Sequence, residues 1–354
     1  MKLPLISVVM PVYNGGQHLI DAVASIVAQT FQNWELICVN DGSTDDSGRI
    51  LNWIAEMDSR IRVVHQSNAG IVAALNAGCE ISQASLVMRM DNDDIALPDR
   101  MALQLEYMNR NPDCVVCGGA ILEMDSESAP LGQTRLATSH EQIVKDLLHR
   151  RTGHFHPTTL IRRDALQSEG GYRSNYEWVE DHDLWLRLSR RGRLANLSDV
   201  VLCYRQHAQS ICWQRSSQQR ILMNELLTEA YRMRGLEIPP HVILDHATER
   251  SAAGPGKWAR AAAKGGFPRT ALKHLGEMNR GEYPWSYKVR MTGETLLRLG
   301  TSTVKSMFRE ANSTRVPSFE QWHDAWSAYN EPRSSHKKLV LQEKVISAPP
   351  QRVA

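Results

Sequence analysis

The sequence predicts an α/β protein with a mostly parallel sheet, helices on both faces of that sheet, and a helical C-terminal extension. In the first hundred residues, short runs of β-branched and other apolar side chains alternate with segments of helical spacing. The apolar runs are continuous, which is typical of strands that are covered on both faces. Ligands bind such sheets at the carboxyl ends of the strands, so the residues that follow each strand are the first candidates for a functional site.

The expected elements are separated by turns rich in glycine, proline, asparagine and aspartate. In the first part of the chain we expect strands at 6–10, 35–39, 62–65 and 86–90, and helices at 17–29, 45–58 and 70–82. The next segments are expected to be a helix over 98–110 opened by Pro98, a strand over 114–119, a hairpin or loop over 120–137 and a helix over 139–149. A strand from residue 154, a helix over 179–191 and a strand over 195–204 follow.

The chain of 354 residues has a net charge of +2, but its two parts differ in sign. Residues 1–212 carry 19 Lys and Arg against 26 Asp and Glu, whereas residues 213–354 carry 22 against 13. We expect an α/β domain over 1–212, a basic helical extension over 213–311 and a disordered polar tail over 312–354. A basic extension favours contact with an anionic membrane or a phosphorylated acceptor, and a solvated basic face without a partner explains the charge equally well. The segment 286–311 fits either a helix lying on anionic lipid or one packed on the domain.

Neither a signal peptide nor a transmembrane helix is expected. Pro4 and Pro11 interrupt the apolar run that follows Lys2, and the sequence contains no apolar stretch of about 18 residues. The six cysteines form no disulfide framework, and Cys114 and Cys117 fit a buried strand better than a metal or redox pair. These features favour a cytoplasmic protein, in contact with the inner face of the membrane if the extension binds lipid.

Three carboxylates, Asp91, Asp93 and Asp94, follow the expected strand at 86–90. Carboxylates this close repel one another, and a Mg²⁺ or Mn²⁺ ion shared with substrate phosphates relieves that repulsion. A turn stabilised by aspartate side chains is the alternative. His207 is a candidate metal or phosphate ligand, whereas His154 and His156 fit residues of a strand better than a chelating pair.

Two further acidic clusters lie at expected element boundaries. Asp41-Gly42-Ser43 fits either recognition of a nucleotide base by the Asp41 carboxylate or simple capping of the next helix. Glu180-Asp181-His182-Asp183 fits either a general base close to an acceptor hydroxyl or acidic residues that stabilise the first turn of a helix.

Taken together, these segments resemble the family 2 glycosyltransferases, which have the GT-A fold. The resemblance covers about residues 1–210 and rests on Pro11-Val12-Tyr13-Asn14, Trp34-Glu35-Leu36-Ile37, Asp41-Gly42-Ser43-Thr44-Asp45, Asn68-Ala69-Gly70, Leu75-Asn76-Ala77-Gly78, Met90-Asp91-Asn92-Asp93-Asp94, His156-Pro157-Thr158, Gly170-Gly171-Tyr172, Glu180-Asp181-His182-Asp183-Leu184-Trp185 and Tyr204-Arg205-Gln206-His207. Leu75 stands where many relatives have an arginine, which marks a subfamily feature.

The resemblance implies an inverting transferase that moves a sugar from a nucleotide donor, a UDP-sugar first of all, to a hydroxyl of a glycan or lipid-linked acceptor in cell-surface or exopolysaccharide synthesis. It implies Asp181 as catalytic base, and Asp93, Asp91 and His207 around a Mn²⁺ or Mg²⁺ ion. The implied donor-binding residues are Pro11, Val12, Tyr13, Asn14, Asp41, Gly42, Ser43, Asn68, Gly70, Asp91 and Asn92. The implied acceptor region contains Glu180, His156, Gly171 and Trp178.

Two other functions fit the sequence less well, and no nucleic-acid partner is expected. A non-catalytic nucleotide-sugar-binding scaffold of the same fold would be expected to lack one of Asp91, Asp93 and Asp181, all of which are present. A nucleotidyltransferase would need a basic glycine-rich loop near the first strand, but residues 14–18 contain neither lysine nor arginine. The sequence therefore favours the transferase.

Overall fold

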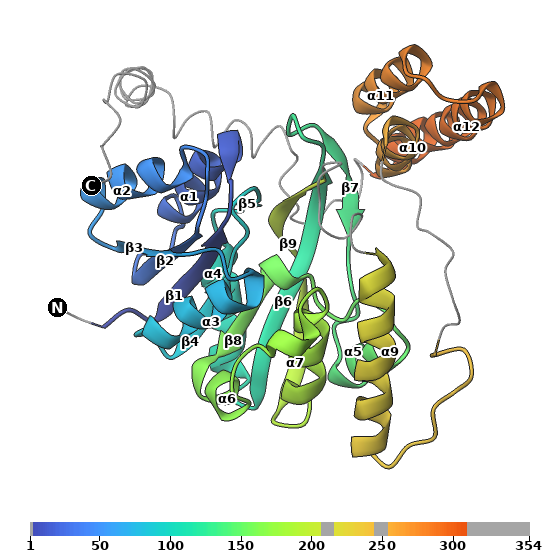
Figure 1. The fold of residues 1–354 in the computed structure, drawn as a ribbon. Coiled ribbons are helices and arrows are strands. Elements are labelled where there is room, and N and C mark those ends of the chain that lie inside the picture. The colour runs from blue at the N-terminus through green and yellow to red at the C-terminus, as the bar shows by residue number, and fades with distance from the viewer. Residues whose placement is uncertain (1–2, 207–215, 244–253, 310–354) are drawn as a thin grey trace. The chain divides into compact units, whose positions relative to one another are not determined.

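The computed structural model describes residues 3–206, 216–243 and 254–309. Within these ranges the central element is a nine-stranded sheet, in the order β3-β2-β1-β4-β8-β6-β9-β5, with β7 paired to β6 outside that path (Figure 1). The strands are β1 (Ile6–Val12), β2 (Trp34–Asp41), β3 (Ile61–Gln66), β4 (Leu86–Arg89), β5 (Ile95–Ala96), β6 (Cys114–Met124), β7 (Pro130–Thr134), β8 (Leu160–Arg162) and β9 (Arg193–Arg205).

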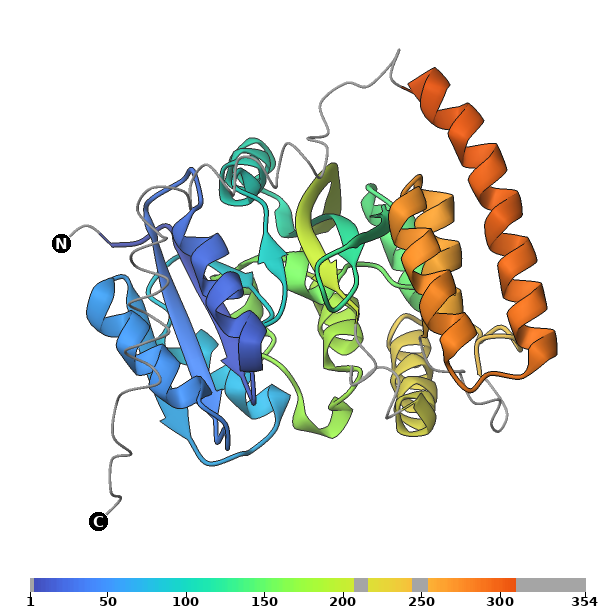
Figure 2. The ribbon, with the colours of Figure 1, turned by 90° about the horizontal axis from the view of Figure 1, so that it is seen from above.

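The helices comprise those between the strands and a C-terminal group. Around the sheet lie α1 (Leu19–Val27), α2 (Ser47–Met57), α3 (Ile71–Ile81), α4 (Arg100–Arg110), α5 (His140–Leu148), α6 (Arg163–Ser168), α7 (Glu180–Leu188) and α9 (Ser216–Met233). Short 3-10 turns occur at Gly16–His18, His156–Thr158 and Ser174–Tyr176. The C-terminal group is α10 (Pro255–Gly265), α11 (Pro268–Arg280) and α12 (Trp285–Arg309), three helices that lie side by side in Figures 1 and 2.

The sheet is parallel on one side and mixed on the other. Strands β3, β2, β1 and β4 run parallel, so the loops that follow them open at one edge. Strand β8 is antiparallel to both β4 and β6, while β6 and β9 are parallel to each other. The parallel half therefore brings the residues after β1, β2 and β4 to the same edge of the sheet.

Alternate side chains of the central strands enter two separate cores. Val8 belongs to the core beneath α1, α2 and α4, whereas its neighbour Val9 belongs to the core that contains residues of α3, α5, α7 and α9. Burial on both faces explains why the strand sequences are continuously apolar. The predicted fold class, with helices on both faces and helices after the sheet domain, is confirmed.

Most of the predicted elements are present, with shifted ends. Helix α4 begins at Arg100 rather than at Pro98, which lies before its N-cap Asp99. Of the hairpin or loop predicted over 120–137, the hairpin is present, because β6 continues to Met124 and pairs with β7. The strand predicted from residue 154 begins only at Leu160, after a 3-10 turn. Ser139 does cap α5, since its hydroxyl accepts a hydrogen bond from the Gln142 amide at 3.4 Å.

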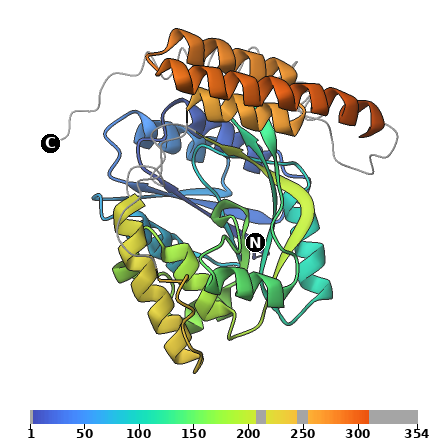
Figure 3. The same ribbon diagram turned by 90° about the vertical axis from the view of Figure 1, so that its right-hand side faces the viewer.

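Helices α10 and α11 pack against the β6–β7 hairpin (Figure 3). Leu131 of β7 is fully buried among Ala262, Ala263 and Ala271. At the hairpin turn, the Asp125 carboxylate accepts from Lys273 Nζ at 2.7 Å and lies 2.9 Å from His274 Nε2. The sequence boundary at residue 212 and the tail over 312–354 stay predictions, and the tail lies outside the described residues.

No helix in the described ranges combines the length and the apolar character needed to cross a lipid bilayer.

Candidate active site

Hydrogen bonds join the loop after β1 to the loop after β2. The Asn14 amide donates to Ser43 Oγ at 3.0 Å, and Asn14 Oδ1 accepts from the Thr44 amide at 2.8 Å. The Gly15 amide donates to Ser47 Oγ at 2.9 Å. The predicted donor-binding residues Asn14 and Ser43, with Thr44 and Ser47, thus fix the two loops to each other.

The Asp41 carboxylate, at the end of β2, binds the start of α3. It accepts hydrogen bonds from the amides of Ala69 and Gly70 at 2.9 and 3.0 Å and from the Gln66 side chain at 2.8 Å, and it is 4% exposed. A carboxylate here satisfies amides that the helix itself leaves without partners. That Asp41 also holds a nucleotide base stays a prediction.

Two glycines of these loops are required by the backbone. Gly42 has φ +69°, and a Cβ there would lie 2.6 Å from the Asn68 amide nitrogen. Gly70 has φ +90°, and its Cβ would collide with the Glu177 carboxylate. Residues with a side chain rarely adopt such φ angles. The absence of a side chain at both positions also lets the neighbouring segments approach closely.

The predicted donor-binding residues at the end of β1 differ in how exposed their side chains are. Pro11 and Val12 are buried within the strand, and Val12 belongs to the core, whereas Tyr13 is 52% exposed at its end. Any contact of Val12 with a donor would therefore come from its backbone. Asn92 lies against this loop, since a Cβ on Gly15 would come within 3.2 Å of its side chain.

Asp91, Asp93 and Asp94 form a carboxylate cluster after β4. One carboxylate oxygen from each lies within 4.8 Å of the others. Burial raises the pKa of Asp94 well above its ordinary value, and the charges of Asp93 and Asp91 raise it further. Burial also raises the pKa of Asp91, although the charge of Arg89 opposes the shift. A divalent cation would relieve the repulsion in such a cluster.

Arg89, the last residue of β4, is buried beside this cluster and forms an ion pair with Asp91. Burial opposes its charge, but the carboxylate of Asp91 holds its pKa above the ordinary value. Its charge also acts on Glu180 and Asp181 of α7 and on Tyr172. Arg89 thus lies within electrostatic reach of both the carboxylate cluster and the candidate base.

Arg205, the last residue of β9, holds the other side of the cluster. Its amide donates to Asp94 Oδ1 at 2.8 Å, and its Nε donates to the Asp93 carbonyl oxygen at 2.8 Å. Its Nη1 donates to Ser128 Oγ at 2.8 Å in the turn of the β6–β7 hairpin. Arg205 is 2% exposed, so this arrangement is buried.

Glu180 and Asp181 begin helix α7. Burial raises the pKa of Glu180 to about 8, and the charge of Asp181 adds to that shift. Burial also raises the pKa of Asp181, whose Oδ1 accepts from the His182 amide at 2.7 Å. The third acid of this turn, Asp183, is fully buried and paired with Arg173 and Arg187, so its role is structural.

The predicted acceptor residues lie around the segment before α7. His156 is 9% exposed, and its Nε2 lies 2.9 Å from the hydroxyl of Tyr172. Gly171 and Trp178 both have positive φ angles, +74° and +79°. Asn76 of α3 bonds both the amide and the carbonyl of Tyr172, at 2.9 and 2.8 Å, which fixes this segment on the sheet domain. Contact of these residues with an acceptor stays a prediction.

Cys114, Cys117 and His154, which could be considered for a metal or redox role, have simpler structural explanations. Cys114 and Cys117 are buried free thiols of β6, and burial raises the pKa of Cys114 to about 11. His154 is buried with Nδ1 2.7 Å from Asn196 Oδ1, and burial lowers its pKa to about 4. His207 lies outside the described residues.

Known proteins are similar to this chain in sequence or in fold. The sequence profile described as "Glycosyl transferase family 2" matches residues 7–170. The amylovoran biosynthesis glycosyltransferase AmsE of Erwinia amylovora is 32% identical over 203 residues, 56% of this chain and 75% of that protein. The O-antigen biosynthesis glycosyltransferase WbnJ of Escherichia coli is 31% identical over 212 residues, 59% of this chain and 82% of that protein.

This chain belongs to glycosyltransferase family 2. The match with an uncharacterized glycosyltransferase of Haemophilus influenzae, 31% identical, covers 58% of this chain and 66% of that protein. A structure of Staphylococcus aureus TarS 1–349 in complex with UDP-GlcNAc is similar in fold, with a TM-score of 0.50 at 14% identity over 88% of this chain and 93% of that one. The GT-A fold expected from the sequence is therefore present.

In this family 2 glycosyltransferase, two arginines at the site, Arg89 and Arg205, have no role predicted from the sequence. Arg89 interrupts the apolar run of β4, and a cation within a buried strand was a signal that it has a charged partner. Arg205 was part of a matched segment but received no role, because its contacts with residues 93, 94 and 128 are far away in sequence.

Proposed function

We propose that this glycosyltransferase transfers a sugar, with inversion, from a nucleoside-diphosphate donor to a hydroxyl group of a glycan or lipid-linked acceptor. The observation that carries the proposal is the ion pair of Arg89 with Asp91, because the charge of the same guanidinium also acts to lower the pKa of Asp181, which burial raises. A transfer site needs these two carboxylates near each other, one at the leaving diphosphate and one at the attacking hydroxyl. The UDP-GlcNAc complex of TarS supports a UDP-sugar as the first donor to test.

The residues at the carboxylate cluster fit a divalent cation. Their oxygens are close enough to share an ion, and burial, together with the charges of the neighbouring carboxylates, raises the pKa values of Asp91 and Asp94. Asp93 and Asp91 would hold Mg²⁺ or Mn²⁺, together with His207. When bound, such an ion supplies positive charge for the leaving diphosphate.

Asp181 would act as the base that takes the proton of the acceptor hydroxyl. Its raised pKa makes it a stronger base than an ordinary aspartate, while the charge of Arg89 keeps the ionised form accessible. Glu180 has a pKa of about 8 and holds its proton at neutral pH, so it adds no second charge beside Asp181. A single displacement then inverts the anomeric centre, and a donor that is α-linked to its nucleotide would yield a β-glycoside.

The biological role we propose is cell-surface or exopolysaccharide synthesis. Support comes from the names of AmsE and WbnJ, which are assigned to amylovoran and O-antigen biosynthesis. The alternative is a scaffold of the same fold that binds nucleotide-sugars without turnover.

The experiment that tests the proposal is nucleotide release from a panel of UDP-, GDP- and dTDP-sugars, with and without Mn²⁺. Release from one donor that requires the ion and is lost on Asp181→Asn is the expected result, because slow donor hydrolysis uses the same site in the absence of acceptor. Binding of a donor without release, with or without candidate acceptors, would contradict catalysis and favour the scaffold. If every donor in the panel shows no binding and no release, that result would contradict both functions.

A further inference from the structure

A group of charged side chains joins helix α11 to the turn of the β6–β7 hairpin, outside the catalytic site. Asp125 begins this turn and is 1% exposed. Its Oδ2 atom accepts a hydrogen bond from Lys273 Nζ at 2.7 Å and lies 2.9 Å from His274 Nε2. Burial alone would raise the pKa of Asp125, but hydrogen bonds, first of all those from His274 and Lys273, hold it below the ordinary value. Helix α11 thus keeps a buried carboxylate ionised.

The two oxygens of the Asp125 carboxylate have different partners. Oδ1 accepts from the amides of Glu127 and Ala129, at 2.9 and 2.8 Å, and so shapes the turn itself. Oδ2 is the oxygen that faces Lys273 and His274. A buried carboxylate that loses a cation is stabilised by taking a proton or by moving toward water, and both changes disturb the bonds that it makes. The shape of the turn therefore depends on the side chains of α11.

The same turn holds Arg205 of β9, which contacts the carboxylate loop. Arg205 Nη1 donates to Ser128 Oγ at 2.8 Å and to the carbonyl oxygens of Asp125 and Ser126 at 3.4 and 3.3 Å. The Nε atom of the same guanidinium donates to the Asp93 carbonyl oxygen at 2.8 Å. Because a guanidinium is planar and rigid, three acceptors from one turn fix the direction in which its Nε points.

The β6–β7 hairpin is attached on both sides. On one side, the Gln206 amide donates to the Met124 carbonyl oxygen at 2.8 Å, and the Gln206 side chain donates to the Glu123 carboxylate. On the other side, α10 lies so close that a Cβ on Gly265 would come within 2.6 Å of the Leu131 carbonyl oxygen. A displacement of the C-terminal helices relative to the hairpin is therefore transmitted to the end of β9.

We propose that helix α11 positions the loop of Asp93 through Asp125 and Arg205, and thereby sets the affinity of the carboxylate cluster for its divalent cation. The proposal rests on the function proposed above, in which this cluster holds the ion. Lys273 and His274 contact Asp125 rather than the cluster, so both are positioning residues. Groups that orient the ligands of a metal influence its affinity strongly, because affinity depends on ligand geometry.

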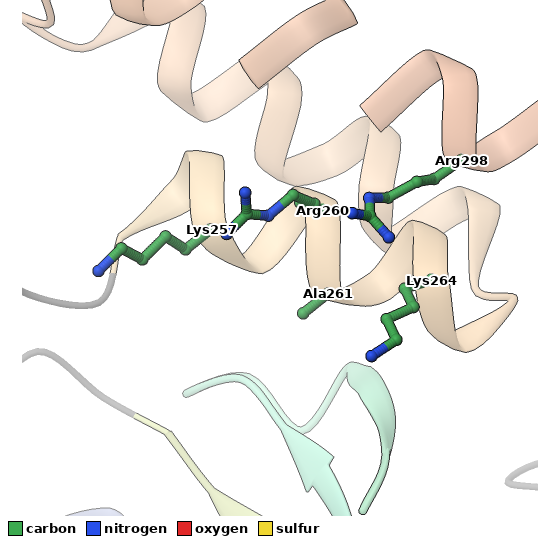
Figure 4. Close-up of a pocket in the computed structure, with 5 residues that line it drawn as sticks. All are labelled: Lys257, Arg260, Ala261, Lys264 and Arg298. Carbon is green, nitrogen blue, oxygen red and sulfur yellow. The ribbon is translucent and has the colours of Figure 1, made fainter. Parts of the chain in front are cut away.

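The test compares variants of the full-length protein that each change one cation of the C-terminal helices. Lys273→Met removes the partner of Asp125, and Lys273→Arg restores a cation that can pair with Asp125 and Glu127. The matched control is Arg260→Met. Arg260 of α10 (Figure 4) pairs with Glu294 of α12 at 2.7 Å, so its loss breaks an ion pair within the helical group and leaves the hairpin turn unchanged.

Two measurements follow the metal site without requiring turnover. The electron paramagnetic resonance signal of free Mn²⁺ gives the affinity for the ion, with and without UDP. Hydrogen exchange in EDTA gives the mobility of the segment 91–96, which contains the carboxylate cluster and β5. Thermal unfolding of each variant shows how much stability it has lost.

We expect Lys273→Met to weaken Mn²⁺ binding about three-fold or more, a smaller loss than the roughly ten-fold or greater loss typical when a direct partner of a metal ligand is removed. Exchange over 91–96 should accelerate in the same variant, and Lys273→Arg should reverse most of both effects. Arg260→Met should lower the thermal stability without either effect. If Lys273→Met does not fold, Lys273→Gln, which keeps a donor but not the charge, takes its place.

The outcomes distinguish this inference from the proposed function. Wild-type protein that binds Mn²⁺ with an affinity unchanged by Lys273→Met overturns the role of α11 alone. Equal losses of affinity in Lys273→Met and Arg260→Met overturn it as well, because they would reflect a general loss of stability. Wild-type protein that binds no Mn²⁺, with or without UDP, contradicts the metal site and overturns both proposals.

Discussion

The Nε atom of Arg205 donates a hydrogen bond to the backbone carbonyl oxygen of Asp93 at 2.8 Å. Since Arg205 also holds Asp94 through its amide and Ser128 through its guanidinium, it fixes the carboxylate loop to the β6–β7 hairpin. The residue therefore determines where the Asp93 side chain can lie, although its own contact is to the backbone.

We expect Arg205→Lys to lower nucleotide release about ten-fold and to raise the Mn²⁺ concentration that gives half-maximal rate. A lysine cannot reproduce the planar set of donors, so the bond to Asp93 and the bond to Ser128 cannot both form. The loss of buried hydrogen bonds should also cost about 1–3 kcal/mol of unfolding free energy. Titration of release with Mn²⁺ tests the prediction, and Arg193→Lys, at an exposed position, is the control. A lower stability with an unchanged Mn²⁺ requirement would mean that Arg205 only supports the fold.

Replacing Asp181 with Asn should reduce sugar transfer about 10²- to 10⁴-fold, the usual contribution of a general base, while donor binding is retained. Asn keeps the size of the side chain but cannot take the proton of the acceptor. Rates come from a transfer assay and donor affinity from calorimetry. Asp199→Asn, on an exposed part of β9, is the matched control. Normal turnover in the Asp181 variant would rule out this residue as the base.

Glu180 should make the protein less stable as the pH rises. With a pKa of about 8 in the folded protein, Glu180 keeps a proton that the unfolded chain releases near its ordinary pKa of about 4.5. Between these values, one such proton lowers the unfolding free energy by up to about 1.4 kcal/mol per pH unit. Unfolding free energies are measured with urea at pH 5 to 8 in EDTA. They should decrease less steeply with pH for Glu180→Gln than for the wild type. The exposed Glu237→Gln serves as control, and equal slopes in all three proteins would refute the assignment.

The sequence predicted the fold better than the connections within the site. Local sequence patterns predict the apolar strands β1, β2 and β4. The same patterns predict the polar residues that follow these strands. Glycines 42 and 70 were matched as motif residues, but the Asn68 amide and the Glu177 carboxylate that exclude a side chain there come from other segments. Strand β5 has only two residues and depends on pairing with β9, which no local pattern shows. The same applies to Arg89 and Arg205, whose partners are fixed by the tertiary structure.

The contact of His274 with Asp125 should depend on pH. His274 faces Asp125 of the hairpin and Glu277 of its own helix, with the Trp258 ring against it. Lys273 pairs with the same Asp125 carboxylate. Although burial opposes the charge of His274, the hydrogen bonds to Asp125 and Glu277 raise its pKa above the ordinary 6.5. Its contribution is therefore complete below about pH 6.5 and is lost as the pH rises through the raised value.

Hydrogen exchange of α10 and α11 measures this contact directly. We expect exchange in α11 to accelerate in the wild type as the pH rises through the raised pKa of His274, beyond the intrinsic pH dependence, and His274→Gln to remove that extra acceleration. Asp125→Asn should raise exchange at all pH values, because Lys273 also loses one of its two carboxylate partners, the other being Glu127. Exchange rates that follow the intrinsic pH dependence in the wild type would contradict the prediction.

The packing of Leu131 and Asp125 against α10 and α11 has a practical consequence for protein production. A shortened chain that ends near residue 212 would expose Leu131 on β7, whose only partner strand among the described residues is β6, and would leave Asp125 without its two cations. An exposed apolar edge strand favours aggregation. Shortened proteins and chimeras with related enzymes should therefore keep this hairpin and the helices that cover it together, as one exchangeable piece.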